Sequence, residues 1–128
     1  MTNNAAKKKK MKILLVIKDS DMLGLLAALL EKNGHDVTMA SESVEAFRRL
    51  LKMENVGLLV ASLNLWPDGA EPIVKAARLT NPTLPVLLIA GSQSNGYRER
   101  IMLMDAVFWQ TGDGADSFML AVEQALSH

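Results

Sequence analysis

Short apolar runs alternate along this chain with longer segments of helical periodicity. The β-rich runs are Lys12–Ile17, Val37–Ala40, Val56–Ala61, Val86–Ala90 and Ala106–Trp109. The helical patterns cover about Ser20–Asn33, Ser43–Met53, a segment that begins near Pro72, Asn95–Met104 and Ala115–Leu126. Nearly continuous Ile, Leu and Val are typical of strands that are buried on both faces of a parallel sheet. Repeated βα units of this length therefore predict a doubly wound α/β fold, (βα)5, with a five-stranded parallel sheet.

Length and charge favour one domain with a basic arm. We predict that residues 1–11, which contain Lys7–Lys10, form a disordered arm and that residues 12–127 form the domain. A single short arm is weak evidence for nucleic-acid binding, and we do not expect a nucleic-acid partner. No apolar run approaches the roughly 20 residues of a membrane span, and no secretory signal is visible. We therefore expect a cytoplasmic protein without a membrane partner, which the absence of cysteine weakly supports.

The carboxyl ends of the strands are the place where a ligand would bind in such a fold. "ILLVIKDSD" ends the first strand in Lys18, Asp19 and Asp21, which raises the question of whether these residues form a site. The alternative is that Asp19 or Ser20 caps the following helix and that Asp21 favours the dipole of its first turn. Asp68, which precedes Gly69, is typical of a turn. For each aspartate we favour the structural role.

Several stretches of the sequence resemble a known family. They are "KILLV", "HDVTMASESVEAFRRL", "LLVASLNLWPDG", "NPTLPVLLIA" and "AVFWQTG". Over Lys12–Leu126 the chain resembles the receiver domain of bacterial two-component response regulators. In that family "D-I-N-M-P-x-x-D-G" and "P-V-I-V-L-T-A" stand where this chain has "SLNLWPDG" and "PVLLIAG". The resemblance implies a flavodoxin-like fold.

The resemblance also implies that the chemical positions of the family are altered here. Receivers accept a phosphoryl group on an aspartate at the end of the third strand, and that position matches Ser62. The acidic pair that holds Mg²⁺ matches Ile17 and Lys18. The Thr or Ser that ends the fourth strand matches Ala90, and the lysine that ends the fifth strand matches Thr111. The resemblance therefore implies a degenerate, atypical receiver that lacks the phosphorylation-site residues.

The chemistry of these side chains also indicates that they cannot bind Mg²⁺ or accept a phosphoryl group. Mg²⁺ prefers oxygen ligands, isoleucine offers none, and lysine adds a positive charge. A serine hydroxyl is un-ionised at neutral pH and needs an adjacent base, which neither His35 nor His128 can supply from its position in the sequence. We therefore expect no metal, no cofactor and no enzymatic activity.

The leading hypothesis is a pseudo-receiver that acts in bacterial signal transduction through protein–protein contacts, without phosphorylation. In the family, partners or dimer mates dock on the face formed by the fourth helix, fifth strand and fifth helix. Here that face would include Tyr97, Arg98 and Phe108, of which Phe108 matches the family's aromatic switch residue. Trp66 is either an exposed anchor for a partner or, as we favour, a side chain that folds over the emptied pocket.

Two rival functions stay open on the sequence. The first is an unusual phosphoryl-accepting receiver that uses Asp19 and Asp21 with a non-standard acceptor such as Asp68. The second is a flavodoxin-like cofactor binder, although "KDSDML" lacks the Ser, Thr and Gly expected of its phosphate loop. Trp109 is predicted to lie in the core.

Overall fold

The computed structural model describes residues 10–91 and 96–127. Its strands are β1 (Lys12–Val16), β2 (Asp36–Ala40), β3 (Leu58–Ser62), β4 (Val86–Ala90) and β5 (Val107–Gln110). Its helices are α1 (Ser20–Lys32), α2 (Ser43–Lys52), α3 (Glu71–Thr80), α4 (Tyr97–Leu103) and α5 (Ala115–Ser127). All strand pairs are parallel, and the sheet has the order β2-β1-β3-β4-β5. The predicted doubly wound (βα)5 fold is confirmed.

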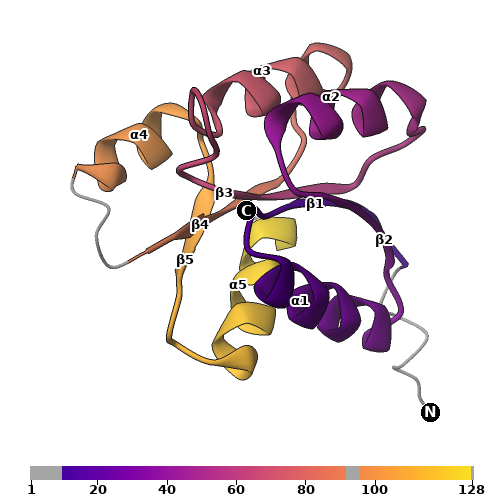
Figure 1. Cartoon of the computed structure of the whole chain (residues 1–128), viewed down its shortest axis with the longest axis vertical. Helices are drawn as coiled ribbons and strands as arrows, with labels where there is room; N and C mark the ends of the chain where they lie inside the picture. The colour runs from indigo at the N-terminus through magenta and orange to yellow at the C-terminus, as the bar shows by residue number, and fades with distance from the viewer. Residues whose placement is uncertain (1–9, 92–95, 128) are drawn as a thin grey trace.

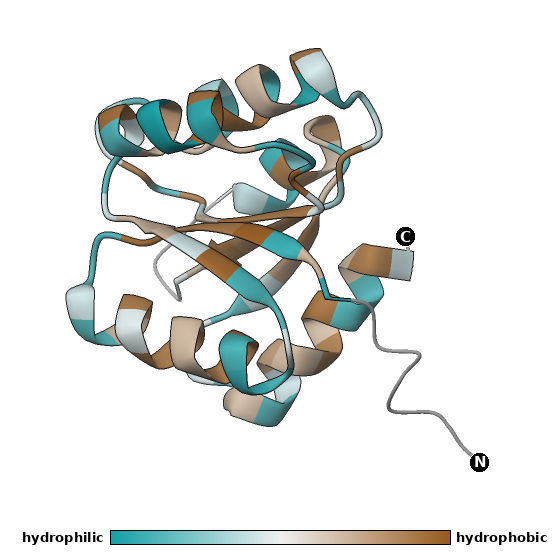
Figure 2. Ribbon diagram, turned by 90° about the vertical axis from the view of Figure 1, so that its right-hand side faces the viewer, coloured by the Kyte–Doolittle hydropathy of each residue, from teal (hydrophilic) through white to brown (hydrophobic). Residues whose placement is uncertain are grey.

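The sheet separates two layers of helices. Helices α1 and α5 lie on one face, and α2, α3 and α4 lie on the other (Figure 1). Successive residues of a strand point to opposite faces, so Leu14 and Leu59 join one apolar cluster while Ile13 and Leu58 join the other. In Figure 2 the central strands are mostly hydrophobic, whereas hydrophobic and hydrophilic residues alternate along the helices. Burial on both faces explains why the central strands have nearly continuous apolar sequences.

The observed boundaries differ from the predicted ones by one or two residues. The third strand begins at Leu58 rather than Val56, and it includes Ser62, which pairs with Ile89. Met11, the last residue of the predicted arm, donates its backbone N–H to His35 Nδ1 at 3.2 Å. Residues 1–9 of the predicted arm lie outside the described residues, as does Asn95, the predicted start of the fourth helix.

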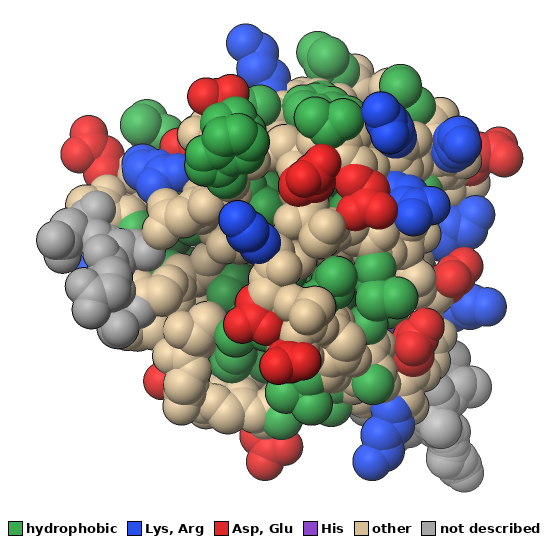
Figure 3. All heavy atoms as spheres, viewed as in Figure 1, with side chains coloured by type: hydrophobic (Ala, Val, Ile, Leu, Met, Phe, Trp, Pro, Cys, Tyr) green, Lys and Arg blue, Asp and Glu red, His purple; other side chains and the backbone are tan. Residues whose placement is uncertain are grey.

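Helix α2 buries less of its apolar surface than its sequence indicates. We would assign Val44 and Leu51 to the buried stripe, but they are 55% and 86% exposed. The fully buried residue of this helix is Ala46, whose small side chain lets the backbone approach the sheet and leaves its larger neighbours at the periphery. Figure 3 shows hydrophobic side chains exposed among charged ones on the face seen in Figure 1.

Candidate functional site at the carboxyl edge of the sheet

The structure brings the positions predicted from the family resemblance to one edge of the sheet. Ser62 is the last residue of β3, and Ala90 is the last residue of β4. Ile17 directly follows β1, and its N–H donates to the carbonyl of Ala40 at 3.0 Å. Thr111 directly follows β5, and its N–H donates to the carbonyl of Ala90 at 3.0 Å. Because the strands are parallel, these residues share the edge at which ligands bind in this fold.

Apolar side chains occupy two of these edge positions. Ile17 is 3% exposed and belongs to the cluster beneath α1 and α5, and Ala90 is 1% exposed in the opposite cluster. Lys18 is exposed, whereas Ser62 and Thr111 are partly buried. Within residues 10–91 and 96–127, no three or more His, Cys, Asp or Glu side chains gather in a way that could hold a metal ion. The described edge therefore offers hydroxyl and ammonium groups but no carboxylate cluster.

Asp19, Asp21 and Asp68 occupy separate structural positions. Asp19 is the N-cap of α1, and its Oδ1 accepts hydrogen bonds from the N–H groups of Asp21 at 2.9 Å and Met22 at 3.1 Å. Asp21 is exposed in the first turn of that helix, where a negative charge interacts favourably with the positive end of the helix dipole. Asp68 is exposed in the loop between β3 and α3. The predicted capping role of Asp19 is confirmed.

An open pocket lies beside the β3–α3 loop. Its volume is about 420 Å³, and it is lined by Asn64, Leu65, Trp66, Pro67, Asp68, Gly69, Glu71 and Arg100. Trp66 is 74% exposed, and its carbonyl accepts a hydrogen bond from Ser43 Oγ at 3.2 Å. The expectation that Trp66 folds down to fill the emptied edge is therefore wrong. The loop is held to α2 by its backbone, which leaves the indole at the surface.

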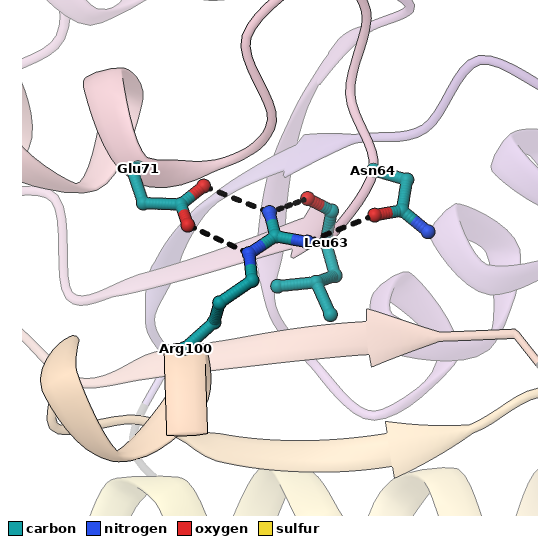
Figure 4. A network of polar contacts seen from close by, with 4 residues as sticks. All are labelled: Leu63, Asn64, Glu71 and Arg100. Carbon is teal, nitrogen blue, oxygen red and sulfur yellow. Dashed lines mark hydrogen bonds and ion pairs between the residues drawn. The ribbon is translucent and has the colours of Figure 1, made fainter. Parts of the chain in front are cut away.

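Arg100 links α4 to α3 and to the end of β3 (Figure 4). Its Nε donates to Glu71 Oε2 at 2.7 Å, and its Nη2 donates to Glu71 Oε1 at 2.9 Å, which makes a bidentate pair. Nη2 also donates to the carbonyl of Leu63 at 3.0 Å, and Nη1 donates to Asn64 Oδ1 at 3.1 Å. These hydrogen bonds lower the pKa of Glu71 and raise that of Arg100.

The sequence carries no local signal for this arginine network. Glu71 and Arg100 are 29 positions apart, so no local spacing pairs them. Each residue, taken alone, looks like an ordinary charged residue of a solvated helix. Only the folded arrangement, in which α3 and α4 lie on the same face of the sheet, brings the two groups together (Figure 1).

Tyr97 and Phe108 form an aromatic contact between α4 and β5. Their ring centroids are 5.5 Å apart with an interplanar angle of 70°, which is an edge-to-face arrangement. Phe108 is 39% exposed on β5, which pairs with β4 and, within the described residues, forms an edge of the sheet. Arg98 is exposed on α4. Three of the four predicted contact residues therefore share one region, and Trp66 belongs to a different element.

Trp109 lies in the core, as predicted. It is 7% exposed, and its ring packs edge-to-face on Phe118 with centroids 5.2 Å apart. Its Nε1 is buried and has no hydrogen-bond partner among residues 10–91 and 96–127. The two tryptophans of the chain thus have opposite environments.

Comparison with known proteins supports the fold class. No protein-family model matches the sequence, and no curated protein sequence matches it significantly. Among solved structures, a response regulator receiver domain protein from Clostridium thermocellum is similar, with a TM-score of 0.80 and 20% identity over 91% of this chain and 94% of that one. CheY4 of Vibrio cholerae, a chemotaxis response regulator, gives a TM-score of 0.80 and 16% identity over 92% of this chain and 100% of its own.

A third similar structure is that of a longer protein. NtrX from Brucella abortus, solved in complex with ADP, gives a TM-score of 0.82 and 22% identity over 93% of this chain but only 27% of its own. Identities at this level establish a shared fold and leave the function to be argued from the site. The fold is thus the flavodoxin-like fold of response-regulator receiver domains. In the part of the chain that the structure describes, no helix has both the length and the apolar character needed to cross a membrane.

Proposed function

We propose that this chain is a pseudo-receiver, a module that takes part in two-component-type signalling through protein contacts and does not accept a phosphoryl group. The observation that carries the proposal is the pair of buried apolar side chains, Ile17 and Ala90, at the edge where receivers are expected to bind metal and phosphoryl oxygens. A transferring phosphoryl group needs cationic or hydrogen-bonding partners for its developing charge, and metal ions usually supply most of that stabilisation. Neither of these side chains can ligate a metal or donate a hydrogen bond.

The direct test is exposure to a small phosphoryl donor. We expect the intact mass of the protein to be unchanged after incubation with acetyl phosphate and Mg²⁺, and its tryptophan emission to be unaffected by beryllofluoride with Mg²⁺. A phosphoryl adduct would contradict the proposal, and its location would identify the alternative acceptor. An adduct on Asp68 that disappears in Asp68→Asn would support the rival function, in which Asp19 and Asp21 assist an unusual acceptor.

We further propose that the contact face is formed by α4, β5 and α5, with Tyr97, Arg98 and Phe108 at its centre. Two observations support this face. Phe108 is exposed on an edge strand, which offers unpaired backbone groups to a partner. Large apolar side chains are also exposed on the two flanking helices, namely Met102 at 78%, Leu103 at 81% and Leu120 at 66%.

A second copy of this chain is the first partner to test. We expect sedimentation velocity to detect self-association that Phe108→Ala and Tyr97→Ala weaken by tenfold or more, since aromatic residues often dominate the energy of interfaces. Leu51→Ala is the matched control, because it removes an exposed apolar side chain from α2 on another part of the surface. Self-association that Leu51→Ala weakens as much as Phe108→Ala would refute this face. If the protein is monomeric, the same variants should be compared in a pull-down. Trp66→Ala tests whether the β3–α3 loop contributes.

A further inference from the structure

Helix α4 is short, and two arginine side chains link it or the residues just after it to neighbouring elements. It has seven residues, of which Ile101 is buried. A helix of this length gains little stability from its own hydrogen bonds and depends on tertiary contacts. Arg100 ties its middle to Glu71 of α3, while Arg78 of α3 donates to the carbonyls of Met104 and Asp105 just beyond its end. The position of α4 is therefore set by polar contacts as much as by apolar packing.

Gly69 provides the space in which the Arg100–Glu71 pair fits. A Cβ at position 69 would lie 2.6 Å from Glu71 Oε1 and 2.7 Å from Arg100 Nη2, which is closer than van der Waals contact allows. The φ of Gly69 is +79°, a conformation that residues with a side chain rarely adopt. The loop and the ion pair are thus complementary in shape, and a single methyl group at Gly69 should displace the guanidinium without removing any charge.

The geometry points to Arg100 as a positioning residue, and we propose that it keeps α4, and with it the Tyr97–Phe108 contact, in one preset arrangement without phosphorylation. Tyr97 and Arg100 are three positions apart and so are neighbours on the helix surface. When the guanidinium holds Glu71 and the carbonyl of Leu63, the same helix presents the ring of Tyr97 to Phe108. The inference rests on the proposed function, in which this face is the one that partners contact.

Fluorine NMR can report separately on the Tyr97–Phe108 contact and on the core. The chain contains one tyrosine, so labelling with 3-fluorotyrosine gives a single resonance, that of Tyr97. Labelling with 5-fluorotryptophan gives two, and the buried Trp109 serves as an internal reference for the core. We expect Glu71→Gln and Gly69→Ala to shift or broaden the Tyr97 resonance while the Trp109 resonance stays unchanged. Arg100→Lys, which keeps the charge but loses the bidentate geometry, should give a smaller change in the same direction.

Gly34→Ala is the matched control for Gly69→Ala. Gly34 has a φ of +91°, and a Cβ there would meet no atom within 4 Å, so this variant introduces backbone strain without touching the ion pair. The variants Glu71→Gln, Gly69→Ala and Arg100→Lys all perturb the Arg100–Glu71 pair and are called the pair variants below. An unchanged Tyr97 resonance in all three pair variants would overturn the inference, as would a Tyr97 shift of equal size in Gly34→Ala. A Trp109 shift as large as that of Tyr97 would also count against it, because the change would then spread through the core.

The same variants separate this inference from the proposed function. If the pair variants move Tyr97 and weaken association at the α4–β5–α5 face severalfold, both hold. If the pair variants shift the Tyr97 resonance but neither self-association nor pull-down depends on Phe108, the positioning role of Arg100 is supported and the proposed contact face is wrong. If Phe108→Ala abolishes association but the pair variants leave Tyr97 unmoved, the contact face stands and the positioning role of Arg100 is wrong.

Discussion

Replacing the edge side chains with carboxylates should create a metal-dependent protein. The perturbation is the triple variant Ile17→Asp, Lys18→Asp and Ser62→Asp. Ile17 is 3% exposed, so its loss removes about 1.5–3 kcal/mol of apolar burial. A poorly solvated carboxylate in its place costs at least about 1–3 kcal/mol more, because the penalty is larger for a charged group than for an uncharged one. Without divalent cations, the free energy of unfolding should therefore fall by at least about 2.5 kcal/mol, before any repulsion between the new charges is counted.

Magnesium should restore part of the lost stability in the triple variant only. A ligand present at ten times its Kd stabilises the folded state by RT ln 11, or about 1.4 kcal/mol. For a domain of this size that corresponds to a rise in Tm of about 4–7 °C. The assay is thermal unfolding by circular dichroism over a series of Mg²⁺ concentrations at constant ionic strength. The parent protein should show no specific rise, because the described residues of its edge include no carboxylate cluster to bind the ion.

The control for this experiment is the triple variant with asparagine at the same positions. It loses the same apolar burial but gains no charge, so Mg²⁺ should leave its Tm unchanged. If the aspartate variant does not fold, Lys18→Asp with Ser62→Asp keeps Ile17 in the core and still places two carboxylates at the edge. A parent protein stabilised by Mg²⁺ as strongly as the aspartate variant would refute the reasoning, and so would an aspartate variant that Mg²⁺ does not stabilise.

Three further predictions concern stability. Asp19→Ala removes the N-cap of α1 and should lower the free energy of unfolding by about 1 kcal/mol in urea titrations. The folded pKa of Glu71 lies below its usual value because of the hydrogen bonds from Arg100, so the pair stabilises the fold above about pH 4.5 and loses this effect as the pH falls further. The stability difference between the parent and Glu71→Gln, both measured from pH 7 to 3, should therefore shrink below pH 4.5, from a maximum under about 1 kcal/mol because both side chains are partly exposed. Trp66→Ala should change stability by less than about 0.5 kcal/mol, whereas Trp109→Ala should cost about 3–5 kcal/mol in the same titrations.

The fold could be predicted because its signals are local. Each strand is a short apolar run bounded by polar residues, and Pro72 lies in the first turn of α3, where the absence of its N–H is tolerated. The exposure of Val44 and Leu51 could not be predicted in this way, because helical periodicity does not show how closely a helix approaches the sheet. Ala46 is the residue of α2 that is buried against the sheet. How closely the helix can approach at Ala46 depends on strand residues that lie far away in the sequence.

The residues of the candidate site also differ in whether the sequence could predict their positions. The positions Ile17, Ser62 and Ala90 follow from the resemblance to receiver domains, and they lie at one edge of the sheet because the strands that precede them are parallel neighbours. The Arg100–Glu71 pair could not, since it depends on the placement of two helices and on the missing side chain of Gly69. Long-range polar contacts of this kind have no periodic pattern, so they are visible only after the chain is folded.

The apolar residues at the carboxyl edge of the sheet and the contacts of Arg100 have a common consequence for regulation. A ligand can shift a conformational equilibrium only if it binds one state more tightly than the other. Under the proposed function, the buried apolar side chains of Ile17 and Ala90 leave no oxygens at these two positions through which a phosphoryl group and its metal could make that distinction. Under the further inference, the hydrogen bonds of Arg100 to Glu71 and Leu63 then favour one arrangement of α4 at all times. Under these proposals, the output of the α4–β5–α5 face would be controlled by the concentration of the partner or by a contact that competes for Glu71, and not by the lifetime of an acyl phosphate.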